Sequence, residues 1–169
     1  MDIEPIIPRM EMFPNAVAQL TSDLMSDDHR WKPASGAWSI LEVICHLADE
    51  EEFDFRPRLE STLSDPNAVW PPIDPEGWAI ERRYNEQSLA EQLERFSRER
   101  AQSIGWLRGL NFPNWKALHQ HPSIGPVRAG DLLVSWVCHD ALHLRQLAKR
   151  LFELSQRDMP GFSTNYAGP

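Results

Sequence analysis

The stretch from Trp136 to Leu147 places two histidines, His139 and His143, four positions apart in a largely apolar run. If the run is a helix, four residues advance the chain by little more than one turn, so both imidazoles lie on one stripe. Leucines flank the same predicted stripe, namely Leu132, Leu142 and Leu147. The stripe should therefore face a core, where unpaired polar rings are costly. Two imidazoles at this spacing can also bind one metal ion.

Four segments have the apolar periodicity of amphipathic helices. The first covers about residues 14–26, with Pro14 at its start or at a kink in a helix that begins earlier. The second begins at Ser39, which forms a capping-box pattern with Glu42, and runs to about residue 63 with a kink at Pro57. A second capping box, Ser88 with Glu91, begins the third, which ends near residue 109. The fourth covers about residues 128–154.

The connections between these segments carry proline and glycine and no clear strand pattern. Residues 64–78 contain four prolines and predict a long irregular crossover, and residues 111–127 predict a loop. The chain is thus predicted to be all-α, a four-helix bundle with a long crossover between its second and third helices. We expect the bundle domain to span residues 1–156 and an irregular tail to span residues 157–169.

The composition excludes several classes of protein. The net charge is −8 and no basic face is apparent, so nucleic acid is not an expected partner. The beginning of the chain lacks a secretion-signal pattern, and its apolar runs are too short to span a membrane. Two cysteines, Cys45 and Cys138, cannot form a disulfide framework, and we expect both to be buried thiols. These features predict a cytoplasmic protein.

A third histidine, His46, lies in the second helical segment, at the edge of its apolar face beside Val43 and Leu47. Together with His139 and His143 it would complete a three-nitrogen site. Three protein ligands leave coordination positions open, which is typical of catalytic zinc sites. The alternative is that each histidine is a hydrogen-bonded core residue.

The order of several short motifs resembles the DinB-like superfamily and, within it, the branch of YfiT-like metal-dependent hydrolases. The matching residues are Gly36-Ala37-Trp38-Ser39-Ile40, Val43 through His46-Leu47-Ala48-Asp49, His121-Pro122 and His139-Asp140 through His143. The resemblance covers about residues 10–154. It implies a four-helix bundle, often a homodimer, with zinc or nickel held by His46, His139 and His143. Family members commonly begin the last helix with threonine or serine, where this chain has Arg128.

Several other side chains are candidates for roles beside the three histidines, and each also has a simpler interpretation. Asp140 is a candidate to orient a ligand, and Glu50 is the best-placed carboxylate for general-base work. The simpler interpretation makes Asp140 a surface residue and Glu50 part of a solvated acidic run that covers residues 49–52. His119 and His121 are spaced to share one face of an extended segment, but a proline-rich loop favours no metal role for them.

Three imidazoles with open coordination allow hydrolysis by an activated water or attack by an activated thiol. The resemblance implies both kinds of activity, including transfer of low-molecular-weight thiols such as bacillithiol or mycothiol. We therefore expect a divalent-metal-dependent hydrolase or thiol S-transferase that acts on a small molecule. The alternative is a non-catalytic metal-binding stress-response protein. Five aromatic residues are candidates to line a pocket over the metal: Trp38, Phe53, Trp70, Trp78 and Trp136.

Overall fold

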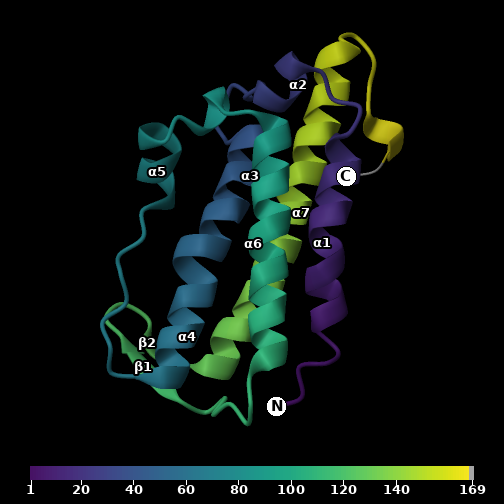
Figure 1. Cartoon of the computed structure of the whole chain (residues 1–169). Coiled ribbons are helices and arrows are strands. Elements are labelled where there is room, and N and C mark those ends of the chain that lie inside the picture. The colour runs from purple at the N-terminus through teal and green to yellow at the C-terminus, as the bar shows by residue number, and fades with distance from the viewer. Residues whose placement is uncertain (168–169) are drawn as a thin grey trace.

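The computed structural model describes residues 1–167, and its long helices lie side by side along one axis (Figure 1). The helices are α1 (Ile7–Thr21), α2 (Ser26–Arg30), α3 (Ile40–Asp49), α4 (Arg56–Ser64), α5 (Pro75–Glu81), α6 (Leu89–Gly109) and α7 (Ala129–Asp158). A π-helical segment, η1 (Glu50–Phe55), joins α3 to α4, and short 3₁₀ turns form η2 (Tyr84–Glu86) and η3 (Asn165–Ala167). The prediction of an all-α four-helix bundle is confirmed, with α1, the α3–α4 helix, α6 and α7 as its helices.

The two serine caps form as the sequence predicts. Ser39 Oγ accepts the backbone N–H of Glu42, and the Glu42 carboxylate accepts the backbone N–H of Ser39. Ser88 Oγ accepts the N–H of Glu91 at the beginning of α6. At α7, Arg128 offers no hydroxyl, and the carboxylate of Asp131 accepts the backbone N–H of Arg128, as Glu42 does for Ser39. Only this half of the capping box is therefore present at α7.

The first helix follows the second of the two alternatives, in which it begins before Pro14. α1 begins at Ile7, so Pro14 lies inside the helix and is buried. A second proline, Pro57, lies in the first turn of α4, directly after η1. We expected the helix to be irregular at Pro57. The irregular turns lie just before this proline, in the π-helical segment η1.

The acidic run that follows α3 is not a solvated face, which corrects the sequence interpretation. Asp49, Glu50 and Glu51 are 0%, 4% and 1% exposed, and Asp54 is also buried. The wider turn of η1 adds residues to this stretch, so its side chains rotate inward between α6 and α7. Arginines from neighbouring elements compensate several of these carboxylates, and the sequence pattern alone gave no sign of that pairing.

Two connections contain regular structure that the sequence did not predict. The long crossover from α4 to α6 is present, but it holds the short helix α5, whose first turn is capped by Asp74. The connection from α6 to α7 holds an antiparallel hairpin, β1 (Leu118–His121) with β2 (Gly125–Arg128), where we had expected no strand. Gly125 has a φ of +80° at the turn, a conformation that glycine adopts readily. Figure 1 shows the hairpin at the far end of α4. It shows α5 at the other end of the bundle, beside α3.

The core fills the space between the long helices. Its largest fully buried side chains include Trp136, Arg100, Tyr84 and Phe96. Leu132 and Leu147 are buried as expected, but Leu142 is 53% exposed, because it lies on the outer face of α7. In the part of the chain that the structure describes, no helix is long and apolar enough to cross a membrane.

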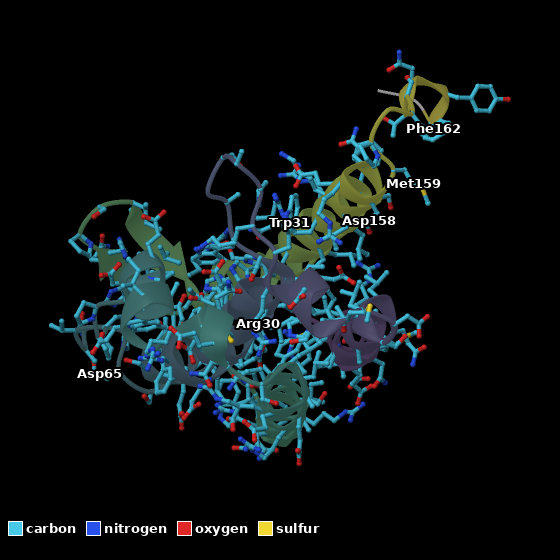
Figure 2. All side chains as sticks on the ribbon, turned by 90° about the horizontal axis from the view of Figure 1, so that it is seen from above. Arg30, Trp31, Asp65, Asp158, Met159 and Phe162 are labelled. Atoms are coloured by element: carbon cyan, nitrogen blue, oxygen red, sulfur yellow. The ribbon has the colours of Figure 1, made fainter. Side chains whose placement is uncertain are left out.

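The last helix is longer than predicted and ends at Asp158. Its last turn is held at Arg157, which pairs with Asp28 of α2 at 2.6 Å. Beyond it, Met159 and Phe162 project away from the bundle and are exposed (Figure 2). Residues 168 and 169 of the predicted irregular tail lie outside the described residues, and the division at residue 156 stays a prediction.

Candidate metal centre

The three histidines singled out in the sequence converge between α3 and α7. Nε2 of His139 lies 3.3 Å from Nε2 of His46 and 3.0 Å from Nε2 of His143. One ring nitrogen from each residue lies within 4.8 Å of the other two. The four-residue spacing on α7 places the rings of His139 and His143 next to each other, edge to face, and the packing of α3 against α7 brings the third ring to them. We call this cluster the His triad.

The protonation of the His triad suits a metal ion. Burial, reinforced by the neighbouring imidazoles, lowers the pKa of His46 to about 2 and the pKa of His139 to about 3. Burial also lowers the pKa of His143. All three rings are therefore neutral near pH 7, the form in which imidazole binds metals. A single N–H can satisfy only one of the two close contacts at His139 Nε2, so three converging nitrogens fit a shared cation better than a hydrogen bond.

Gln146 fixes the orientation of one triad ring. Its Oε1 lies 2.8 Å from Nδ1 of His143, one helical turn away on α7. Since Nε2 of His143 faces the other two imidazoles, Nδ1 carries the proton and donates it to Gln146. The amide nitrogen of Gln146 must then point away from His143. Within residues 1–167 this amide nitrogen has no protein partner, and Gln146 lines a cavity.

Glu50 lies beside the remaining triad nitrogen of α3. Its Oε1 is 3.6 Å from Nδ1 of His46, too far for a hydrogen bond, and both atoms are buried without a partner within residues 1–167. Burial, together with the Asp54 carboxylate, raises the pKa of Glu50 to about 9. Glu50 is therefore a neutral carboxyl at pH 7. In the metal-free protein, Glu50 is therefore not in the form of a base, and no hydrogen bond joins it to His46.

Asp140 points away from the His triad, into a buried ion-pair network, and is not a surface residue. Its two oxygens accept N–H groups of Arg100 at 2.7 and 2.8 Å. Arg100 Nε also donates to Glu51 at 2.8 Å, and Glu51 accepts the indole N–H of Trp136 at 2.6 Å. This Arg100 network connects η1, α6 and α7 directly beside His139. Asp140 thus positions α7 and does not contact a triad histidine within the described structure.

A cavity of about 700 Å³ lies next to two residues that contact the His triad, although no triad histidine lines it. Two of its lining residues contact triad rings: Trp38, whose ring centroid is 5.0 Å from that of His46, and Gln146. The remaining wall comes from Gly36 and Ala37 and from residues 73–76 at the beginning of α5. Part of the crossover from α4 to α6 therefore forms a wall of this cavity. We call this space the triad cavity.

Only one of the five aromatic candidates, Trp38, lies against a triad ring. The aromatic ring beside His139 is Phe55, at a centroid distance of 5.1 Å, and Trp136 stacks on the other side of Phe55. Phe53 is 38% exposed and pairs with Trp78. Phe55 therefore takes the place beside His139 that we expected for Phe53. The π-helical turns of η1 account for this change, because they alter which of the two phenylalanines faces inward.

The hairpin histidines lie apart from the His triad. His119 stacks on Trp70 with a centroid distance of 3.9 Å and contacts the carbonyl oxygen of Pro66 through Nδ1. Nδ1 of His121 accepts two backbone N–H groups of the hairpin turn. Both therefore have structural partners, as the simpler interpretation held. The cysteine prediction is half wrong, because Cys45 is buried but Cys138 is exposed.

Sequence reasoning missed Gln146 and Arg100. The spacing of three residues between His143 and Gln146 was available as a signal, because such pairs share a helix face. Arg100 also gave a signal, because it lies four residues after Phe96 and four residues before Ile104, on the apolar face of its helix. The approach of η1 and α7 pairs it with buried carboxylates.

Comparison with known proteins places the chain in a family. A sequence profile of the DinB superfamily matches residues 9–147, and the chain belongs to this superfamily. A protein of Oceanobacillus iheyensis, named as a candidate metal-dependent hydrolase, is 27% identical over 146 residues, which cover 83% of this chain and 77% of that protein. The structure is similar to YfiT from Bacillus subtilis, described as a probable metal-dependent hydrolase with an unusual four-helix bundle topology. The TM-score is 0.79 at 18% identity, over 88% of this chain and 85% of YfiT.

Proposed function

We propose that the chain is a divalent-metal-dependent enzyme that acts on a small molecule, with His46, His139 and His143 as the metal ligands. The observation that carries the proposal is the convergence of three neutral imidazoles, with one ring nitrogen from each within 4.8 Å of the other two. Similarity to proteins named for metal-dependent hydrolysis supports it. Zinc and nickel are the metals we propose, because both accept imidazole ligands.

The protein groups around the His triad have separable tasks. Gln146 accepts the Nδ1 proton of His143 and so keeps Nε2 free to ligate. Trp38 and Phe55 cover His46 and His139 and keep water away from their rings. The triad cavity holds the substrate next to these groups. A divalent ion held by three imidazoles supplies a Lewis acid that lowers the pKa of a water or a thiol.

Two reactions fit this arrangement: hydrolysis, with water as the nucleophile, and transfer of a low-molecular-weight thiol to a small electrophile. Within residues 1–167 no carboxylate forms a hydrogen bond with a triad histidine, since Glu50 Oε1 is 3.6 Å from Nδ1 of His46 and Asp140 is paired with Arg100. A nucleophile that the metal activates directly needs no separate protein base. Both reactions therefore stay in the proposal.

We further propose a cytoplasmic homodimer that uses the outer face of α7. Val134 and Leu142 are 49% and 53% exposed on this face, eight residues apart on the helix, and Cys138 lies between them. Neighbouring apolar side chains on one exposed helix stripe favour a protein partner. Sedimentation equilibrium of wild type and Leu142→Glu tests this, with a shift from dimer to monomer in the variant. A wild-type monomer at high concentration contradicts it.

Metal content is the first test of the function. Protein purified without a histidine tag should contain close to one equivalent of zinc or nickel, measured by mass spectrometry. His139→Ala should lose the metal and the thermal stabilisation that added metal gives. His121→Ala is the matched control, because this histidine lies in the hairpin, and it should retain both. A wild type that binds no metal, or a His139→Ala variant that is stabilised as strongly as wild type, contradicts the proposal.

Activity is the second test and separates the two reactions. Metal-loaded protein is incubated with a panel of esters and amides, and with low-molecular-weight thiols plus a bimane or chloro-aromatic electrophile. Hydrolysis products or thiol adducts should form only with metal and should disappear in His139→Ala. A protein that binds metal but forms neither product is a binding protein without turnover.

A further inference from the structure

We propose that the triad cavity selects substrates with a positively charged group, such as an amine, away from the bond that reacts. The inference rests on the proposed function and names the substrate class of that site. It comes from the chemistry of the cavity wall and not from the His triad itself.

The charges of the wall have one sign. Asp74 and Glu76 line the cavity, both are exposed, and no lysine or arginine lines it. Within residues 1–167 neither carboxylate forms an ion pair with a basic side chain. One oxygen of Asp74 accepts the backbone N–H of Gly77 at 3.0 Å, which leaves its second oxygen facing no such donor. An anionic substrate would therefore meet two uncompensated like charges on entry.

An aromatic side chain lies in the same wall. Trp38 lines the cavity next to His46, and an indole face attracts ammonium groups more strongly than any other side-chain ring. Carboxylates and an aromatic ring around one space are the chemistry that recognises organic cations. The net charge of −8 also attracts positively charged molecules at long range.

The other end of a bound molecule meets a hydrogen-bond donor. The amide nitrogen of Gln146 faces away from His143 and has no protein partner within the described residues. It can donate to a carbonyl oxygen that reacts beside the His triad. The cavity thus offers a donor near the reactive site and negative charge at residues 74–76, which favours a molecule with an acyl group at one end and a cation at the other.

Hydroxamic acids of matched chain length test this, because the hydroxamate group binds divalent metals. We would measure the Kd of 6-aminohexanohydroxamate, hexanohydroxamate and adipic acid monohydroxamate for the zinc-loaded protein by calorimetry. The amine should bind roughly fivefold to tenfold tighter than the neutral compound, and the carboxylate should bind weakest. High salt should shrink these differences, because the carboxylates are exposed.

The variant Asp74→Asn/Glu76→Gln removes both charges and keeps the helix cap, since asparagine is also a good N-cap residue. In this variant the three hydroxamates should bind within about twofold of one another. Asp23→Asn/Glu94→Gln changes the net charge equally at exposed positions outside the cavity wall and should keep the wild-type order. This control separates the cavity charges from the overall charge.

Two failures are distinguishable. If zinc and the neutral hydroxamate bind but the charge of the tail has no effect, or the preference survives in Asp74→Asn/Glu76→Gln, the substrate class is wrong and the metal site stands. If the wild type binds neither zinc nor any of the three compounds, the proposed function fails and the inference fails with it.

Discussion

Replacing Arg100 by methionine tests whether the Arg100 network holds α7 beside the His triad. Arg100 is 1% exposed and is shared by two buried carboxylates, with contacts of 2.6–2.8 Å to Glu51 and Asp140. Methionine matches the stem of the side chain but leaves both carboxylates buried without a cation. Removing one partner of a buried ion pair costs about 3–5 kcal/mol of unfolding free energy. For a domain of this size, the expected fall in Tm is roughly 6–20 °C.

The loss of unfolding free energy in Arg100→Met should depend on pH. Burial of the carboxyls determines whether the loss grows or shrinks as the pH rises. Burial raises the pKa of Asp140 to about 6 even with Arg100 present, and without the guanidinium the pKa rises further. A carboxyl whose pKa is higher in the folded state favours folding below its unfolded pKa and opposes folding as the pH rises through its folded pKa. Arg100→Met should therefore lose stability from pH 5 to pH 8, by about 1.4 kcal/mol per pH unit for each carboxyl protonated only in the folded state.

Urea unfolding at pH 5 and pH 8, followed by circular dichroism, measures both effects. Arg98→Met is the matched control, because Arg98 lies on the same helix with its side chain 57% exposed, and it should change the unfolding free energy by less than about 0.5 kcal/mol. Arg100→Met/Asp140→Asn should have a shallower pH dependence than Arg100→Met. A loss below about 1 kcal/mol, or an equal loss at both pH values, refutes the reasoning.

Three further predictions follow from individual groups. Metal-free wild type should lose stability in urea as the pH rises from 5 to 9, between the ordinary pKa of a glutamate and the folded pKa of Glu50, which is raised to about 9, and the loss should level off above pH 9. Glu50→Gln should lose less over this range; equal pH profiles contradict this. A thiol reagent should modify Cys138 quickly in the native protein and Cys45 only on unfolding, since Cys138 is exposed and burial raises the pKa of Cys45 to about 12; two fast thiols contradict this. Gln146→Glu keeps an acceptor for His143 and should retain zinc affinity in calorimetry, while Gln146→Met should weaken it about tenfold; equal affinities contradict an orienting role.

The sequence by itself determined the bundle and the candidate ligands. Apolar residues at helical spacing and the serine caps at Ser39 and Ser88 are local signals, and they form as local rules predict. The pair His139 and His143 shares a stripe through helix geometry alone. His46 could be assigned to the same site only by its place on an apolar face and by resemblance to a family, because nothing local relates it to α7.

Only the tertiary structure decided which charges are buried and which side chains face the site. The π-helical turns of η1 rotate Glu50 and Glu51 inward and exchange Phe53 for Phe55 beside His139. Arg100 becomes a core residue because η1 and α7 bring carboxylates to it from positions far away in the sequence. Such pairings depend on how elements approach one another. The residue type alone does not indicate whether an acidic run or an arginine faces solvent or a buried partner.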